Sequence, residues 1–354
     1  MRRMIYLLFA VILGSCAEST IYYCDILRTY DVDKLLMINP INNIGIYDNM
    51  IFYWSEENDY LLLNFKDLSK NIKKSISFEK GKGPGEISSI NQTKVTEKKI
   101  IIFDSTRKLL QFYDLEGQFI DEFQIKNFEI GSMFDILENT LYVTGMLKNQ
   151  VTKIDLKKNI IKKVPFKVQY KKIADLEKKG FRISPIHIDR KTKNVYISSY
   201  ILPYEINIYN NDLDNIGKLK RKIEKTLYHK FIYNKVGASG SIMVSNMLSD
   251  DQYLYVSFGG GIDKEIRNKK VVVTGIPNDY FISIFNMKNN RYVGEIRISN
   301  FSKLNGMAYL VNVSEKIIDV LIIDFGKPLS TNNDNKNYRV EILKLNNPLY
   351  NHEY

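Results

Sequence analysis

The histidines and carboxylates are the first side chains to consider for catalysis or metal binding. The 3 histidines, His187, His229 and His352, lie far apart in the sequence and share no metal-ligand spacing. His187 belongs to the run IHID at residues 186–189, which has the alternation of a β-strand. Residues i and i+2 of a strand point to one face, so His187 and Asp189 form a candidate acid–base pair. The alternative is that both are polar residues facing water in a channel.

The familiar motifs of nucleophilic and zinc-dependent catalysis are missing from the sequence. There is no G-x-S-x-G nucleophile elbow and no H-E-x-x-H zinc-binding helix. The glycines of Gly259–Gly261 have the composition of a loop and lack the spacing of a dinucleotide-binding turn. We therefore expect no metal and no cofactor, and the sequence identifies no catalytic residue.

A glycine-rich segment, GKGPGE over Gly81–Glu86, is the most distinctive motif in the chain. Its glycines permit positive φ angles, while Pro84 stiffens the backbone. Successive exposed amides in such a loop can bind an anion. We favour the alternative, a tight structural connection between two strands. The segment is not a phosphate-binding P-loop, because no Gly-Lys-Ser/Thr follows at the required spacing.

The N-terminus has the features of an export signal. Two arginines, Arg2 and Arg3, precede the apolar run Ile5–Leu13, and small residues follow it, which predicts a signal peptide over residues 1–15. The apolar run is much shorter than the ~20 residues that a transmembrane helix needs. Residues 13–16, LGSC, resemble the bacterial lipobox.

The lipobox resemblance implies that Cys16 is acylated and anchors the protein to a membrane. We expect residues 16–24 to form a lipid-anchored tether, and we expect a location in the cell envelope, at the outer membrane. We favour the periplasmic face over the cell surface. With Cys16 acylated, Cys24 has no intramolecular partner, so the fold does not depend on a disulfide.

The charge of the chain gives no sign of nucleic-acid binding. The formal net charge is +11, but the lysines are spread along predicted strands and turns. The sequence contains neither a basic helix nor an aromatic–basic stripe. Solvated lysines on sheet surfaces and edges account for this excess.

An internal repeat predicts the architecture of the mature chain. Residues 99–125 contain three alternating apolar runs separated by turns, and a weaker run, Ile90–Val95, precedes them. Similar four-stranded units recur along the chain, which is typical of propeller blades and not of a β-sandwich. We predict an all-β fold over residues 25–354, a six-bladed β-propeller with four-stranded antiparallel blades.

The last predicted blade lacks an outer strand. Its predicted strands are Met307–Val313, Ile317–Ile323 and Arg339–Leu345. The N-terminal segment Ile26–Ile38 has the composition of a strand and belongs to no other unit. We predict that it pairs outside Arg339–Leu345 and closes the ring, which would also hide a sheet edge.

The glycine-rich segment, with IIIFDS at residues 100–105 and LLQFYDLEGQFI at residues 109–120, resembles the NHL-repeat propellers. It is similar above all to the six-bladed, TolB-like propeller lipoproteins of Bacteroidota. This resemblance implies the propeller fold and the lipid anchor, and it implies no particular activity.

Two functions are compatible with these observations. The first is a binding or scaffold module at the cell envelope that recognises a glycan, a peptide or a partner protein. The second is an envelope lyase or hydrolase whose site lies in the propeller mouth. Propellers serve both purposes, so the fold does not distinguish them.

Loop lengths predict which face binds the ligand. With the strands of a blade named A to D from the axis outward, the A–B and C–D turns share one face and are short. The B–C and D–A connections share the other face and contain most of the excess chain, as in Gln169–Gly180, Lys220–Gly240 and Gly259–Asp279. Long loops on a rigid scaffold commonly carry function. Our candidate ligand-binding residues, mostly basic and suited to an acidic or hydroxyl-rich ligand, are Lys82, Glu86, Arg107, Lys108, Arg182, His187 and Lys264.

Overall fold

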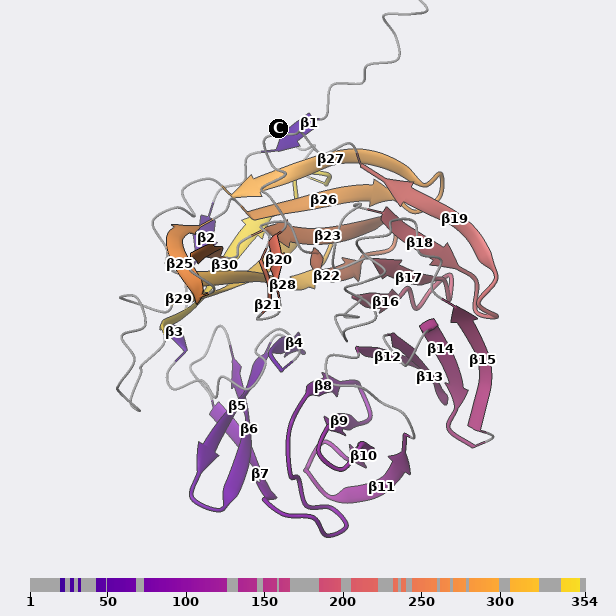
Figure 1. The fold of residues 1–354 in the computed structure, drawn as a ribbon, viewed down its shortest axis with the longest axis vertical. Coiled ribbons are helices and arrows are strands. Elements are labelled where there is room, and N and C mark those ends of the chain that lie inside the picture. Colours follow the sequence, from indigo (N-terminus) through magenta and orange to yellow (C-terminus); the bar gives the residue numbers. More distant parts are fainter. Residues whose placement is uncertain are drawn as a thin grey trace, which may run out of the picture.

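Six antiparallel sheets surround a common axis in the computed structural model of the protein and form a six-bladed β-propeller (Figure 1). The predicted fold class is confirmed. The structure describes residues 20–22, 26–28, 31–32, 43–48, 50–67, 73–125, 133–144, 149–157, 159–165, 185–198, 205–221, 232–234, 237–239, 244–259, 262–267, 270–277, 280–298, 306–324 and 339–350. Within these ranges, no helix is long and apolar enough to cross a membrane.

Each blade is a meander whose strands follow one another from the axis outward. The strands of blades 1 to 3 are β4 (Gly45–Tyr47), β5 (Met50–Glu57), β6 (Tyr60–Asp67), β7 (Lys73–Glu79), β8 (Gln92–Val95), β9 (Ile100–Asp104), β10 (Leu109–Tyr113), β11 (Phe119–Gln124), β12 (Phe134–Leu137), β13 (Thr140–Thr144), β14 (Asn149–Asp155) and β15 (Asn159–Pro165). Those of blades 4 to 6 are β16 (Ile186–Ile188), β17 (Val195–Ser198), β18 (Glu205–Tyr209), β19 (Asn215–Lys220), β22 (Val244–Ser249), β23 (Tyr253–Gly259), β26 (Tyr280–Asn286), β27 (Arg291–Ile298), β28 (Gly306–Val313), β29 (Ile317–Asp324) and β30 (Arg339–Asn346).

The N-terminal segment contributes the outermost strands of blades 5 and 6. Strands β2 (Ile26–Arg28) and β3 (Asp31–Val32) both pair antiparallel with β30, which confirms the predicted closure of the ring. Strand β1 (Thr20–Tyr22) was not predicted. It pairs parallel with β27 at the rim of blade 5 (Figure 1), within the stretch 16–24 that we expected to be a tether. The N-terminal chain thus joins the outer edges of two neighbouring blades.

The hydrophobic core is divided among the interfaces between blades. One cluster joins blades 1 and 2 through Trp54, Leu63 and Ile102, and equivalent clusters lie between each successive pair up to blades 5 and 6. Because both faces of a blade are covered, the central strands are mostly apolar, and every residue of β9 and β10 is buried. Burying one such large side chain contributes about 1.5–3 kcal/mol. Packing of blade against blade therefore fixes the positions of the turns at each end of the ring.

Two of the connections predicted as loops contain hairpins. Strands β20 (Ile232–Asn234) and β21 (Gly237–Ser239) pair between blades 4 and 5. Strands β24 (Ile262–Arg267) and β25 (Lys270–Pro277) pair within the B–C connection of blade 5. The prediction of a loop over Gly259–Asp279 was wrong because it gave more weight to Gly259–Gly261 than to the β-branched run Val271–Val273.

Candidate functional site

Polar side chains on or beside the inner strands bridge successive blades from blade 1 to blade 6. Asn43 donates to the carbonyl of Asn91 at 3.4 Å, which connects blades 1 and 2. The amide of Gln92 donates to the carbonyl of Phe134 at 2.9 Å and accepts from its N–H at 2.9 Å, as a neighbouring strand would. Such bonds satisfy the exposed edges of the inner strands around the axis.

The same arrangement continues around the ring. Asp135 accepts from the N–H of Ile188 at 2.9 Å between blades 3 and 4. Asn246 donates to the carbonyl of Leu310 at 2.7 Å between blades 5 and 6. The equivalent bridge between blades 4 and 5 is made by His187, a residue that the sequence singled out for possible catalysis.

The imidazole of His187 lies between its own blade and blade 5. Its Nε2 is 2.8 Å from the hydroxyl oxygen of Ser249 at the end of β22. Burial lowers the pKa of His187 to about 4, and the neighbouring carboxylate of Asp135 offsets only part of this effect. The side chain is therefore neutral at pH 7 and serves as a bridge between blades.

Asp189 makes no direct hydrogen bond to His187 within the part of the chain that the structure describes. Its Oδ2 accepts the N–H of Thr192 at 2.8 Å and the hydroxyl of the same residue, which caps the turn between β16 and β17. Its Oδ1 accepts from Ser249 at 3.4 Å. The predicted acid–base pair is thus linked only through the Ser249 hydroxyl.

Asp135 is a buried charge on the inner strand β12. Burial by itself would raise the pKa of this carboxyl, but the cations Lys94 and Arg190, the nearby His187 and the Ile188 amide outweigh it and lower the pKa. Lys94 and Arg190 approach the carboxylate to 3.1 and 3.2 Å. Arg190 also donates to the carbonyl of Ile136. Residues from blades 2, 3 and 4 are therefore tied together at this point.

The glycine-rich segment is a structural connection. It joins β7 of blade 1 to β8 of blade 2, and the carboxylate of Glu86 accepts the N–H of Gly83 at 2.7 Å. A Cβ on Gly81 would lie 1.9 Å from an oxygen of that same carboxylate. The space that an external anion would need is occupied by the chain's own Glu86, which agrees with the alternative that we favoured.

Arg107 and Lys108 hold this connection and the edge of blade 2 in place. The Arg107 guanidinium donates to the carbonyls of Gly83 and Glu86 at 2.9 and 3.0 Å. It also pairs with Glu122 at 3.2 Å. Lys108 has a positive φ of 58°, and its carbonyl accepts the N–H of Ile125 at 2.9 Å. The Arg107 side chain is thus engaged by its own backbone surroundings, whereas the Lys108 side chain is exposed.

The remaining candidates are less constrained. Lys82 is exposed on the glycine-rich segment, on the face of the long connections. Lys264 lies in β24, where its backbone pairs with Val273. Arg182 and Cys16 lie outside the described residues. In the described ranges there is also no group of three or more His, Cys, Asp or Glu able to hold a metal ion.

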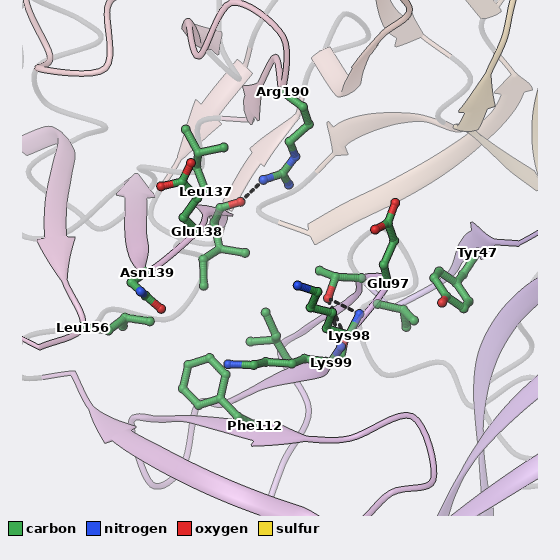
Figure 2. A pocket seen from close by; sticks show the side chains of 14 residues that line it. Tyr47, Glu97, Lys98, Lys99, Phe112, Leu137, Glu138, Asn139, Leu156 and Arg190 are labelled. Carbon is green, nitrogen blue, oxygen red and sulfur yellow. Dashed lines mark hydrogen bonds between the residues drawn. The ribbon is translucent and has the colours of Figure 1, made fainter.

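A pocket opens on the face of the propeller opposite the long connections, among the short turns of blades 2 and 3. Its volume is about 740 Å³, and Figure 2 shows the side chains around it. Most belong to A–B turns or to the strands beside them, and Tyr47 and Arg190 extend the wall towards blades 1 and 4. The lining residues are Tyr47, Val95, Thr96, Glu97, Lys98, Lys99, Ile101, Phe112, Ile136, Leu137, Glu138, Asn139, Leu156 and Arg190.

Sequence reasoning did not identify this pocket. The contributing residues are separated by whole blades, and the turns that carry them are too short to attract attention as binding loops. A usable signal existed: Lys98, Glu138 and Arg190 each follow an inner strand closely, in three successive units. Equivalent positions of successive blades meet at one end of a propeller, so charges that recur there converge at the mouth.

Comparisons with known proteins support the fold. No family model and no curated protein matches the sequence. A DUF4221 family member from Bacteroides vulgatus matches with a TM-score of 0.51 over 92% of this chain and 98% of that one, at 9% identity. The WD40 domain of Toxoplasma gondii coronin matches with a TM-score of 0.48 over 90% and 87%, at 9% identity. At 9% identity, the likeness to the Bacteroides vulgatus protein shows the fold alone.

Proposed function

We propose that this protein is a non-catalytic binding module of the bacterial cell envelope whose ligand occupies the pocket among the short turns of blades 2 and 3. The observation that carries the proposal is the pocket itself. Its volume of about 740 Å³ lies within the range of roughly 300–1,000 Å³ that is usual for small-molecule sites. Its lining combines apolar side chains with a few charged ones, which is the usual composition of such sites.

The polar residues of the inner strands favour binding over catalysis. Asp135 and His187 are titratable groups on the inner strands β12 and β16, and both are used in bridges between blades. Asn43, Gln92 and Asn246 make the same kind of bridge without an ionisable group. A structural role therefore accounts for the polar inner ring, and the pocket above it remains available for a ligand.

The envelope location rests on the sequence. The export signal and the lipobox resemblance at Cys16 support it, and a lipid anchor would keep the propeller at a membrane surface. Strand β1 begins shortly after Cys16 and pairs with the rim of blade 5. An anchored chain would thus be attached through a blade edge, which leaves both ends of the propeller axis open to ligands.

A pocket-filling substitution tests the binding site. Leu156 lines the pocket and is only partly buried, so Leu156→Trp should fill the space without unfolding blade 3. Ile216→Trp is the matched control, because Ile216 is 51% exposed on the outer strand of blade 4. Envelope extracts and compound libraries would be screened for ligands that raise the melting temperature of the wild type. The proposal requires ligands that stabilise the wild type and Ile216→Trp but not Leu156→Trp.

The long-connection face is the competing location, and it is the one that loop lengths predict. Lys82→Gln with Lys264→Gln removes two of its predicted cations without touching the structural Arg107. Loss of ligand binding in that variant, with normal binding by Leu156→Trp, would place the site on the long-connection face instead.

A hydrolase is the second candidate function, and the His187–Ser249 contact favours it. A serine hydroxyl 2.8 Å from a neutral imidazole is the geometry of a nucleophile and its general base. We expect no labelling of the protein by a fluorophosphonate probe, because Ser249 also donates to Asp189. Labelling that disappears in Ser249→Ala would establish the hydrolase.

A further inference from the structure

The charges and apolar groups around the pocket are arranged in two layers. We infer that the pocket binds an organic carboxylate with an apolar body, an inference that rests on the proposed binding function and names its ligand class. The floor comes from two blades, and its apolar residues are Val95, Ile101, Phe112, Ile136, Leu137 and Leu156. Ile101, Phe112 and Ile136 are buried parts of the core between blades 2 and 3, so the floor is rigid.

The side chains of Lys98 and Lys99 lie at the edge of this apolar floor, next to the solvent. Lys98 and Lys99 belong to the turn between β8 and β9. The Lys99 ammonium lies 5.4 Å from the centroid of the Phe112 ring, a cation–π contact that holds it above the floor. In Figure 2 the ammonium of Lys99 adjoins Phe112, and Arg190 faces this turn from across the pocket.

The basic residues of the lining outnumber the acidic ones. Glu138 is paired with Lys193 at 3.3 Å. The lining contains three cations, Lys98, Lys99 and Arg190, and two acids, Glu97 and Glu138, so its formal charge is 3 − 2 = +1. Lys94, which precedes the lining residue Val95, and Arg190 both form ion pairs with the single carboxylate of Asp135. The mouth therefore favours an anion over a cation.

The turn that carries the lysines is well fixed. The hydroxyl of Thr96 accepts the N–H of Lys99 at 3.1 Å, and the N–H of Thr96 donates to the carbonyl of Lys99 at 2.9 Å. A carboxylate at the rim can accept charge-assisted hydrogen bonds from the lysine ammonium groups, which are the strong class of such bonds. The apolar part of the same molecule would then lie over Phe112 and Leu156. An anion without an apolar body would leave the floor exposed to water.

Two sources share this chemistry: the free acid of an acyl chain and the C-terminal end of a peptide with an apolar last residue. Decanoate represents the acyl chain and N-acetylphenylalanine represents the peptide end. N-acetylphenylalanine amide is the neutral counterpart of N-acetylphenylalanine. Calorimetric titration of the wild-type mature chain should show about tenfold weaker binding of the amide than of N-acetylphenylalanine, the effect of losing one charge-assisted contact. Tighter binding of decanoate would indicate an acyl chain, and tighter binding of N-acetylphenylalanine a peptide end.

The double variant Lys98→Gln/Lys99→Gln should remove the preference for the carboxylate while keeping the weak binding of the amide. Lys288→Gln/Lys316→Gln is the matched control, because both lysines are exposed, lie away from the pocket and change the net charge equally. Equal binding of acid and amide by the wild type, or no binding of either carboxylate, overturns the inference. The proposed binding function fails separately, if no ligand of any class distinguishes the wild type from Leu156→Trp.

Discussion

The imidazole Nε2 of His187 lies 2.8 Å from the Oγ of Ser249, so a titratable group bridges blades 4 and 5 beside the axis. Burial depresses the pKa of His187 to about 4 in the folded protein, against about 6.5 in an unfolded chain. Between about pH 4 and pH 6.5, His187 is protonated in the unfolded state and remains neutral in the folded state. The stability that depends on neutral His187 is therefore complete above pH 6.5 and is lost as the pH falls towards 4.

The pH dependence of unfolding tests this prediction. Wild-type stability should fall by up to about 3 kcal/mol between pH 7 and pH 4 on account of His187. His187→Asn should be less stable at pH 7 but should lose less on acidification. The free energy of unfolding would be measured by urea titration at both pH values. Equal losses in the two proteins would mean that His187 does not titrate in this range.

The glycine-rich segment allows a sharp test of its structural role. A methyl group on Gly81 would lie 1.9 Å from Oε2 of Glu86, so Gly81→Ala should displace the carboxylate and weaken the connection of blades 1 and 2. Gly217→Ala is the matched control, because its new methyl group would have no neighbour closer than 3.5 Å. We expect a loss of about 1–3 kcal/mol for Gly81→Ala and little change for Gly217→Ala, measured by thermal unfolding. Equal stability of the two variants would contradict the structural assignment of the motif.

Blade count and ring closure could be predicted from the sequence because both depend on local patterns. Strands such as Ile100–Asp104 are recognisable in the sequence as apolar runs between turn residues. The missing outer strand of blade 6 indicated that Ile26 and its neighbours would supply it. The pocket could not be predicted in the same way. Lys98, Glu138 and Arg190 approach one another only because the blades pack around an axis, and the spacing of those blades is set by large buried side chains.

The role of His187 illustrates the same limit. Its position on an inner strand was predicted correctly. Its partner Ser249 comes from the next blade, 62 residues away, and no pattern in the sequence links the two. The hairpin of β24 and β25 differs, since its alternation is visible in the sequence and was given too little weight.

The N-terminal strands should stabilise the propeller measurably. Strands β2 and β3 cover the outer edge of β30, and β1 covers that of β27. A chain that starts at residue 33 should unfold several degrees below one that starts at residue 17, because two sheet edges lose their backbone partners. Hydrogen exchange should increase in β30 and remain unchanged in β9, which lies in blade 2. Unchanged protection of β30 would show that the ring does not depend on this closure.

Acylation of Cys16 is the prediction on which the envelope location depends. The run LGSC at residues 13–16 carries it, and the short apolar segment before it is suited to an export signal. The wild-type protein, produced in a bacterium that processes lipoproteins, should incorporate labelled fatty acid and sediment with membranes. Cys16→Ala should incorporate none and should accumulate unprocessed. Cys24→Ala is the matched control, since it removes the second of the 2 cysteines and leaves residues 13–16 intact. Acylation of Cys24→Ala should equal that of the wild type. An unlabelled wild-type protein would remove the basis for a lipid anchor. The pocket and its ligand would still be tested independently.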